Sequence, residues 1–436
     1  MNTLAWIGMV GIVILTLLPL VKKENRTKEE MRKAIVTVAI VLGIIITVLV
    51  LGVNYLLALV VGFFAMIVFD KKTYTKKRLI IYGSIILVTG IAGFAILRDN
   101  PEYVLNHLKD NPQTTSLYLA ENSVELITYQ SDVVRPLAST VKILIAAEYA
   151  MQIDAGQLNK DSSVPLADLN RYYLKNSDGG AHEEWLKAMQ SEAKIKNNEV
   201  TLHDVAKGMA TYSSNANTDY LIDLLGISAI NERAKTLGLT QHEDIYQIVS
   251  AVLIPNQIKS ESMNDEQLIK KLEAMSMEEY RTLAEELSEQ MKEGTIKVGD
   301  VTYGPSTDVQ KVWSDRLVGA SANDYGKLLT IISNDELPPI AAETMRDLLE
   351  WPMQLYESNH DRYVHLGAKG GSTAFILTEA LYAENHKGDK VEIVFLIDDL
   401  DFWQGMLVRK NMNSFESKLL GSEDFRLKVQ RELSET

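Results

Sequence analysis

The sequence predicts two parts of different fold class: an N-terminal α-helical transmembrane region of four spans, and a C-terminal α/β domain in which helices flank an antiparallel sheet. Long apolar runs in the first hundred residues predict the first part. A strand hairpin, several helices, three further strands and a last helix predict the second. Charge divides the chain at the same place. Residues 1–98 carry 12 of the 44 basic and 4 of the 58 acidic residues, which gives a balance of +8 there and −22 in the rest.

Four apolar segments predict the membrane spans. Residues 4–21 form the first, and residues 79–97 form the last. The run between them, residues 34–69, is 36 residues long and therefore too long for one span. It is interrupted near residues 52–55, which predicts a helical hairpin with a tight turn. Because basic residues follow the first apolar run rather than precede it, a cleavable secretory signal is not expected.

Basic residues in the predicted loops give the orientation of these spans. They gather at residues 22–33, between the first two spans, and at residues 71–78, between the last two, whereas the turn near residue 52 is uncharged. Basic loops stay in the cytoplasm. The expected protein is therefore a multi-pass protein of the cell membrane, in contact with membrane lipid. Residues from 99 onward are expected on the extracytoplasmic side.

Composition excludes several classes of function. An acidic C-terminal part disfavours a nucleic-acid partner, which requires a basic face. The absence of cysteine excludes disulfides, thiolate metal sites and a cysteine nucleophile. His182-Glu183 is similar to the start of a zinc-peptidase helix, but the second histidine is missing at the required spacing. We therefore expect no metal and no cofactor.

The second part is expected to span residues 114–436, joined to the membrane region by a linker at residues 99–113. Residues 115–120 and 124–129 read as two strands of a hairpin. A strongly charged stretch at residues 255–300 is interpreted as a solvated helical insertion. Further strands are expected at residues 363–368, 374–382 and 391–397, followed by a last helix from about Asp401.

The first candidate for chemistry is the segment Arg135-Pro136-Leu137-Ala138-Ser139-Thr140-Val141-Lys142. Ser139 and Lys142, three residues apart on a helix, share one face. Pro136 prevents a helix from continuing from upstream, so Ser139 is expected near a helix N-terminus, where free N–H groups stabilise an oxyanion. A buried lysine has a lowered pKa and takes the proton of such a serine. Ser-x-x-Lys alone is also common on solvated helix surfaces, so other segments have to support this reading.

Two later segments add candidate residues. The first is Ser213-Ser214-Asn215, where a hydroxyl and an amide on one short loop relay a proton and hold a substrate carbonyl. The second is Lys369-Gly370-Gly371-Ser372, at a strand-like run. A lysine at a strand edge binds a substrate carboxylate, and the two glycines allow a substrate backbone to lie against the strand. Each segment alone is also ordinary turn or hairpin composition.

Taken in order, these segments resemble the three signature motifs of the serine β-lactamases and penicillin-binding proteins: Ser-x-x-Lys, Ser-x-Asn and Lys-Thr/Ser-Gly. The setting is most similar to class A β-lactamases, in which a hairpin and Arg-Pro also precede the first motif. The resemblance covers about residues 110–430. It implies a membrane-anchored serine acyl hydrolase that acts through an acyl-enzyme on a β-lactam or a related amide or ester, such as a cell-wall peptide.

The resemblance implies a role for each motif residue. Ser139 is the acylated nucleophile, and Lys142 is its base or proton relay. Ser213 passes a proton to the leaving group, and Asn215 holds the substrate amide. For substrate binding, the implied residues are Lys369, which attracts a carboxylate, with Gly371 and Ser372 on the same strand. The backbone N–H groups of the nucleophile and of Ser372 form the oxyanion hole.

Two departures from the family pattern affect the expected reaction. Gly370 stands where the family usually has a hydroxyl that binds the β-lactam carboxylate; Ser372 or Thr373 are the candidates to replace it. If residues 254–256 are matched to the Ile-Pro-Asn that ends the family's deacylation loop, Gln247 takes the place of the deacylating glutamate. Gln247 cannot act as a base. Glu243 is the alternative, in a shifted register.

Two further functions stay open at this point. The first is a sensor that is acylated by a β-lactam or binds wall peptide without turnover. The short predicted cytoplasmic loops carry no His-Glu-x-x-His, so such a sensor would need a signalling partner. The second is a degenerate domain used only for binding, which the intact motif residues disfavour. A slowly turned over acyl-enzyme, an esterase and a peptidase all fit the motifs.

Overall fold

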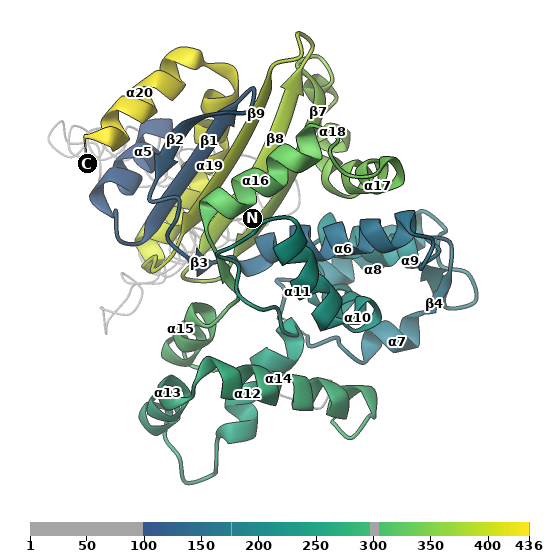
Figure 1. Cartoon of the computed structure of the whole chain (residues 1–436). Coiled ribbons are helices and arrows are strands. Elements are labelled where there is room, and N and C mark those ends of the chain that lie inside the picture. The colour runs from purple at the N-terminus through teal and green to yellow at the C-terminus, as the bar shows by residue number, and fades with distance from the viewer. Residues whose placement is uncertain (1–98, 176, 297–304, 436) are drawn as a thin grey trace, which may run out of the picture. The chain divides into compact units, whose positions relative to one another are not determined.

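The computed structural model describes residues 99–175, 177–296 and 305–435 (Figure 1). The four predicted membrane spans lie outside these residues. Within the part of the chain that is described, no helix has both the length and the apolar character needed to cross a bilayer. Contacts group the residues from Asn100 onward into one unit.

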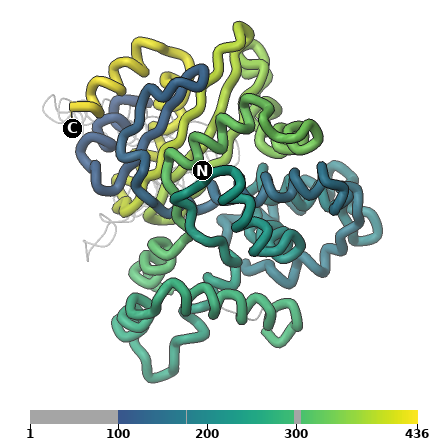
Figure 2. The backbone as a smooth tube through the Cα atoms, viewed as in Figure 1, coloured from purple at the N-terminus to yellow at the C-terminus, as the bar shows by residue number. Residues whose placement is uncertain are grey.

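A five-stranded sheet organises this unit, and all its neighbouring strands are antiparallel in the order β2-β1-β9-β8-β7. The strands are β1 (Thr115–Glu121), β2 (Val124–Tyr129), β7 (Tyr363–Ser372), β8 (Leu377–Asn385) and β9 (Lys390–Ile397). The predicted hairpin and the three late strands are thus confirmed, although β7 continues past residue 368 and β8 begins three residues later than expected. The first strand pairs with the last, from Thr115↔Ile397 to Glu121↔Val391, so opposite ends of the colour scale meet in Figure 2.

One face of the sheet is covered by the first and last helices of the unit. They are α5 (Pro101–Asp110), α19 (Phe402–Gly421) and α20 (Glu423–Ser434) (Figure 1). Apolar side chains such as Leu105 and Phe415 are buried there against the strands. Most of the segment expected to join the two parts, residues 99–113, is thus the helix α5, whose apolar face packs into the core. The predicted start of the last helix near Asp401 is confirmed, and the Asp401 side chain accepts a hydrogen bond from the backbone N–H of Gln404.

Helix α16 (Ala322–Ser333) covers the opposite face of the sheet. The approach is close at Gly326, where a Cβ would lie 2.2 Å from the ring of Tyr118 on β1. A helix residue without a side chain is needed there because the ring fills the space between helix and sheet. The contact ties α16, and the chain around it, to the middle of the sheet.

The helical part of the unit surrounds α6 (Lys142–Asp154), which is apolar on all sides and almost fully buried from Lys142 to Ala150. Such a helix needs partners around its whole circumference. Its neighbours are η2 (Ala138–Val141), α9 (Leu202–Ala210), α10 (Asn215–Leu225), α11 (Ile227–Thr236) and α17 (Pro339–Leu349). The helix α9 begins after Thr201, whose side chain accepts a hydrogen bond from the backbone N–H of Asp204.

The charged segment forms two helices, α13 (Asp265–Ala274) and α14 (Met277–Lys292), each begun by a capping box. The prediction of helix is confirmed, but that of a solvated insertion is wrong on one face. Leu268, Leu272, Tyr280 and Leu287 are buried in the main core, and α14 packs against α12 (Ile248–Ile258). The charges occupy the outer face of an amphipathic helix pair.

The remaining elements are short or peripheral. They are β3 (Arg135–Pro136), β4 (Ser163–Pro165), α7 (Leu166–Asn170), α8 (Ala181–Ser191), β5 (Glu199–Thr201), α15 (Thr307–Asp315), β6 (Gly319–Ala320), α18 (Trp351–Leu355) and η4 (Glu357–Asn359).

Candidate active site

The chain before Ser139 is anchored to the sheet and then turns sharply. Arg135, buried in β3, donates from Nε to Ser116 Oγ at 2.8 Å and pairs with Asp398 at 3.2 Å. Ala138 has a φ of +45°, a strained value for a residue with a side chain. The turn leads into η2 and then α6, so Ser139 lies at the entry to a buried helix, as its sequence predicts.

Lys142 connects Ser139 to the second motif. Its Nζ lies 3.1 Å from Ser139 Oγ, 3.2 Å from Ser213 Oγ and 2.9 Å from Asn215 Oδ1, and it donates to the Ser213 carbonyl at 2.7 Å. The side chain is 1% exposed. Burial, followed by the charge of Lys369, holds the pKa of Lys142 well below its usual value. A lysine with such a pKa is available as a neutral base.

Ser213 joins the two lysines of the site. Lys369 Nζ, 4% exposed as a residue, donates to Ser213 Oγ at 3.0 Å and to the Gly370 carbonyl at 3.0 Å. Burial lowers the pKa of Lys369. Ser213 itself has a φ of +71°. One serine of the site therefore has a left-handed backbone conformation, and the other, Ser139, directly follows a residue that has one. The structure thus brings Ser139, Lys142, Ser213 and Lys369 into one continuous set of contacts.

Asn215 begins α10 and is held by a loop that the sequence analysis did not connect with the site. Its backbone N–H donates to Asp178 Oδ2 at 3.3 Å, and its Nδ2 donates to the Ser177 carbonyl at 3.3 Å. Asp178 also accepts from the backbone of Gly180 and His182. The sequence signal of this loop is turn composition, which predicts a loop but not its neighbours. Asp178 is therefore a site residue that the sequence reading missed.

Strand β7 passes so close to η2 that glycine is required at position 371. A Cβ on Gly371 would lie 2.5 Å from Ser139 N and 2.7 Å from Leu137 O, both backbone atoms. Thr378 Oγ1, on the neighbouring strand, donates to Leu137 O at 2.8 Å and fixes the same contact. This glycine thus lets the nucleophile's backbone approach the strand, a requirement of the fold itself.

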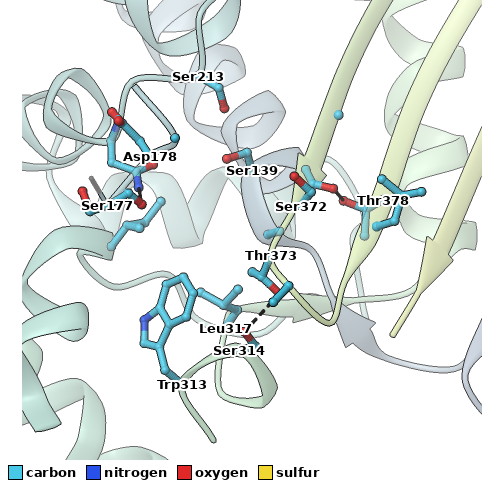
Figure 3. A pocket seen from close by; sticks show the side chains of 18 of the residues that line it. Ser139, Ser177, Asp178, Ser213, Trp313, Ser314, Leu317, Ser372, Thr373 and Thr378 are labelled. Atoms are coloured by element: carbon cyan, nitrogen blue, oxygen red, sulfur yellow. Dashed lines mark hydrogen bonds between the residues drawn. The ribbon is translucent and has the colours of Figure 1, made fainter. Parts of the chain in front are cut away.

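The helix entry at Ser139 and the end of strand β7 border one cavity of about 600 Å³. Figure 3 shows Ser139, Ser213 and Ser372 around this space, with Asp178 and Trp313 on the facing side. Thr373 also lines it, and its Oγ1 accepts from Ser314 Oγ at 3.0 Å. The lysine side chains of the site are not among its lining residues, so the hydroxyls face the cavity while the amines support them from the protein interior.

The two candidate deacylation residues lie away from the cavity lining. Gln247 is buried just before α12, where its Nε2 donates to Asp223 Oδ1 at 3.2 Å, and its Oε1 has no partner among the described residues. The next residue, Ile248, does line the cavity. Glu243 accepts from the backbone of Gly319 at 3.0 Å and is partly exposed. Neither residue contacts Ser139.

A buried carboxylate positions the chain around Gln247. Asp219 of α10 accepts from the backbone N–H groups of Ile248 at 2.8 Å and Val249 at 2.7 Å. Burial raises the pKa of Asp219 to about 7, against the effect of these hydrogen bonds. The start of α12 is therefore fixed to the helix that carries Asn215.

The histidine that was considered for metal binding is part of the core. His182 is fully buried in α8, with Nδ1 2.9 Å from Ser214 Oγ, and its ring stacks on Tyr173. Within the described ranges no group of three or more histidine and carboxylate side chains has the arrangement of a metal site.

The arrangement supports acyl transfer. A hydroxyl next to a neutral amine is a nucleophile, a second hydroxyl between two amines carries a proton to a leaving group, and a helix entry beside a strand edge offers N–H groups to an oxyanion. All three parts converge on the same cavity.

Comparison with known proteins found similar solved structures and one family model. The solved structures similar to this chain include a PBP-A mutant in an acyl-enzyme complex with penicillin G (16% identity, TM-score 0.43, 73% of this chain and 95% of that one). They also include β-lactamases from Chitinophaga pinensis (13%, 0.44, 73% and 99%) and Sphaerobacter thermophilus (15%, 0.43, 73% and 97%). No curated protein matches. The model of the Beta-lactamase2 family, described as a β-lactamase enzyme family, matches residues 101–401, more than half of the chain, and the chain belongs to that family.

Proposed function

We propose that the protein is a membrane-anchored serine acyl hydrolase that forms an acyl-enzyme at Ser139 from a β-lactam or a related amide or ester, such as a cell-wall peptide. One observation carries this proposal: the contacts that run from Ser139 Oγ through Lys142 Nζ to Ser213 Oγ and Lys369 Nζ. Each neighbour in this series is within hydrogen-bond distance of the next.

The proposed acylation uses these contacts in order. Lys142 takes the proton of Ser139 while Ser139 Oγ bonds to the acyl carbon. The oxyanion is stabilised by backbone N–H groups at the helix entry and at Ser372. The bond from the acyl carbon to the leaving nitrogen or oxygen then breaks, and the proton reaches the leaving atom through Ser213. Water later releases the acid and restores the serine.

The test is covalent labelling followed over time. The protein is incubated with a penicillin or a fluorophosphonate, and its intact mass is recorded at intervals. The expected result is an adduct on the peptide that carries Ser139: the full mass of the penicillin, or the mass of the fluorophosphonate less hydrogen fluoride. An unchanged mass with both probes, in protein whose thermal unfolding shows a folded state, would refute the proposal.

A second candidate is favoured by one observation. The position expected to carry the deacylating base holds Gln247, and the cavity lining includes neither it nor Glu243. A domain that is acylated and not released suits a sensor of β-lactam or wall peptide. In the labelling experiment a sensor keeps one equivalent of adduct for hours, whereas a hydrolase consumes many equivalents of substrate.

Membrane anchoring is part of the proposal and is supported by the apolar runs and basic loops of residues 1–98. Single cysteines introduced near residue 75 and near residue 290 test it, because the chain has no native cysteine. In whole cells, an impermeant thiol reagent should modify the second and leave the first intact. The reverse pattern would contradict both the orientation and a role at the cell wall.

A further inference from the structure

A carboxylate occupies the wall of the cavity next to the Lys369 segment. Glu379 of β8 lies directly across from Gly370 of β7, and both line the cavity. A Cβ on Gly370 would lie 2.4 Å from Glu379 Oε2. Because β7 is the edge strand, the carboxylate extends over the glycine to the rim of the sheet. The glycine that departs from the family pattern therefore makes room for an acidic side chain.

This carboxylate has no hydrogen bond or ion pair to any residue in the described part of the chain. Lys369, whose charge acts on it, already donates to Ser213 and to the Gly370 carbonyl. A second carboxylate, Glu416 of α19, acts on Glu379 as a like charge. Burial and this neighbour raise the pKa of Glu379, and burial raises the pKa of Glu416 to about 7. Glu379 and Glu416 thus act on each other as like charges, and the neighbouring cation, Lys369, already donates its hydrogen bonds to other groups.

The position of Glu379 in the cavity suits contact with the leaving group of a substrate. This step rests on the proposed function. Ser213 delivers the proton to the leaving group and is bonded to Lys369, and the next residue along the strand is Gly370. Glu379, across from Gly370, lines the same cavity as Ser139 and Ser213, and under the proposed function this end of the cavity receives the leaving group.

We propose that Glu379 selects the leaving group: the cavity accepts an acyl donor whose leaving group carries an ammonium there rather than a carboxylate. An ammonium supplies three N–H donors to oxygens that have no protein partner, and its charge compensates the acidic pair. A bound ammonium favours the ionised form of Glu379 against the burial and the like charge that raise its pKa, whereas a bound carboxylate brings no donor and raises that pKa further. The ammonium takes no part in bond exchange, which proceeds at Ser139 as described above.

Three esters of phenylacetic acid test the proposal. Their leaving groups are 3-(aminomethyl)phenol, 3-(hydroxymethyl)phenol and 3-carboxyphenol, which differ in charge at one position. Acylation of Ser139 is followed by phenol release and intact mass, and each rate is divided by the rate of that ester with hydroxide. The wild type should acylate with the ammonium ester at least about tenfold faster than with the carboxylate ester, the effect of one nearby charge.

Two variants assign this preference to its residue. Glu379→Gln keeps the size of the side chain and removes the charge, so the ratio should fall to about one, mainly because the carboxylate ester reacts faster. Glu384→Gln is the matched control, since Glu384 lies on the same strand but belongs to the far end, near Lys390, and does not line the cavity. Its ratio should equal that of the wild type.

The wild-type measurement alone can overturn the inference. Equal corrected rates, or faster reaction with the carboxylate ester, would refute it. A preference that persists in Glu379→Gln would refute the role of this residue. If none of the three esters acylates Ser139, the proposed function itself fails, a different result from acylation without charge preference.

Discussion

Lys142 and Lys369 reach the same hydroxyl: their Nζ atoms lie 3.2 Å and 3.0 Å from Ser213 Oγ. Because the two amines are so close, it is unfavourable for both to be protonated at once, and the charge of Lys369 lowers the pKa of Lys142. Lys369 of the third motif therefore affects Lys142 of the first motif, and both contact Ser213 of the second. The following predictions depend on this relationship and on the backbone contacts that hold it.

Ser139→Ala should abolish covalent labelling by penicillin or fluorophosphonate, because its hydroxyl is the proposed nucleophile, 3.1 Å from Lys142 Nζ at the entry to η2 and α6. Ser123→Ala, in the exposed turn between β1 and β2, is the control and should label as the wild type does. Intact mass gives the result. Labelling that survives the first substitution would end the assignment of the nucleophile.

Lys142→Ala should slow acylation by at least about a hundredfold, the usual contribution of general-base assistance. The acylation rate of the wild type should rise with pH through the lowered pKa of Lys142, since the neutral amine is the active form. Rates measured by stopped flow between pH 5 and 10 check both statements. An acylation rate in Lys142→Ala that equals that of the wild type across this range would contradict Lys142 as the base.

Lys369→Met should move that pH profile to higher pH. Removal of a positive charge favours the protonated form of Lys142, so its pKa rises and more alkaline solution is needed to obtain the neutral base. The midpoint of the profile separates this effect from a simple loss of substrate binding, which lowers the rate without moving the midpoint. Lys390→Met, on β9 and hydrogen-bonded to the Ser333 carbonyl, should leave the midpoint in place.

Gly371→Ala and Gly370→Ala should differ although they are neighbours. The Cβ at position 371 would meet backbone atoms of Ser139 and Leu137, which have to move, whereas the Cβ at position 370 would meet the flexible end of Glu379. A displacement of about 1 Å costs on the order of a hundredfold in rate. Gly371→Ala should therefore lose at least that much acylation with the neutral ester, and Gly370→Ala should retain most of it.

Acylation by a penicillin should outpace deacylation, because the position expected to carry the deacylating base holds Gln247, which is not a base and whose side chain donates to Asp223 rather than lining the cavity. The absence of a positioned base slows release by roughly 10²–10⁴. Gln247→Glu should shorten the life of the adduct, as followed by mass after removal of excess penicillin. Glu243→Gln should not change it, since Glu243 holds the backbone of Gly319. If Glu243→Gln instead traps the adduct of a fast wild type, Glu243 is the base and the protein is a working β-lactamase.

Local sequence determined much of this protein. Strand-like runs predicted the hairpin and the late strands, and Pro136 predicted that a helix begins beside Ser139, because backbone geometry depends on near neighbours. The spacing of Ser139 and Lys142 predicted their contact for the same reason, since residues one helical turn apart share a face. The remaining motif residues were identified by the resemblance of ordered segments to a family.

Only the tertiary structure decided which distant residues meet. Ser213 and Lys369 are 156 residues apart, and their contact depends on the packing of η2 against β7 and β8 rather than on any local pattern. Asp178 and Glu379 lie in segments whose composition indicates an ordinary turn and an ordinary strand. The buried faces of α5, α13 and α14 likewise depend on what packs against them. Charge and composition describe a segment, whereas burial, pKa and the choice of partners arise from the surroundings that folding creates.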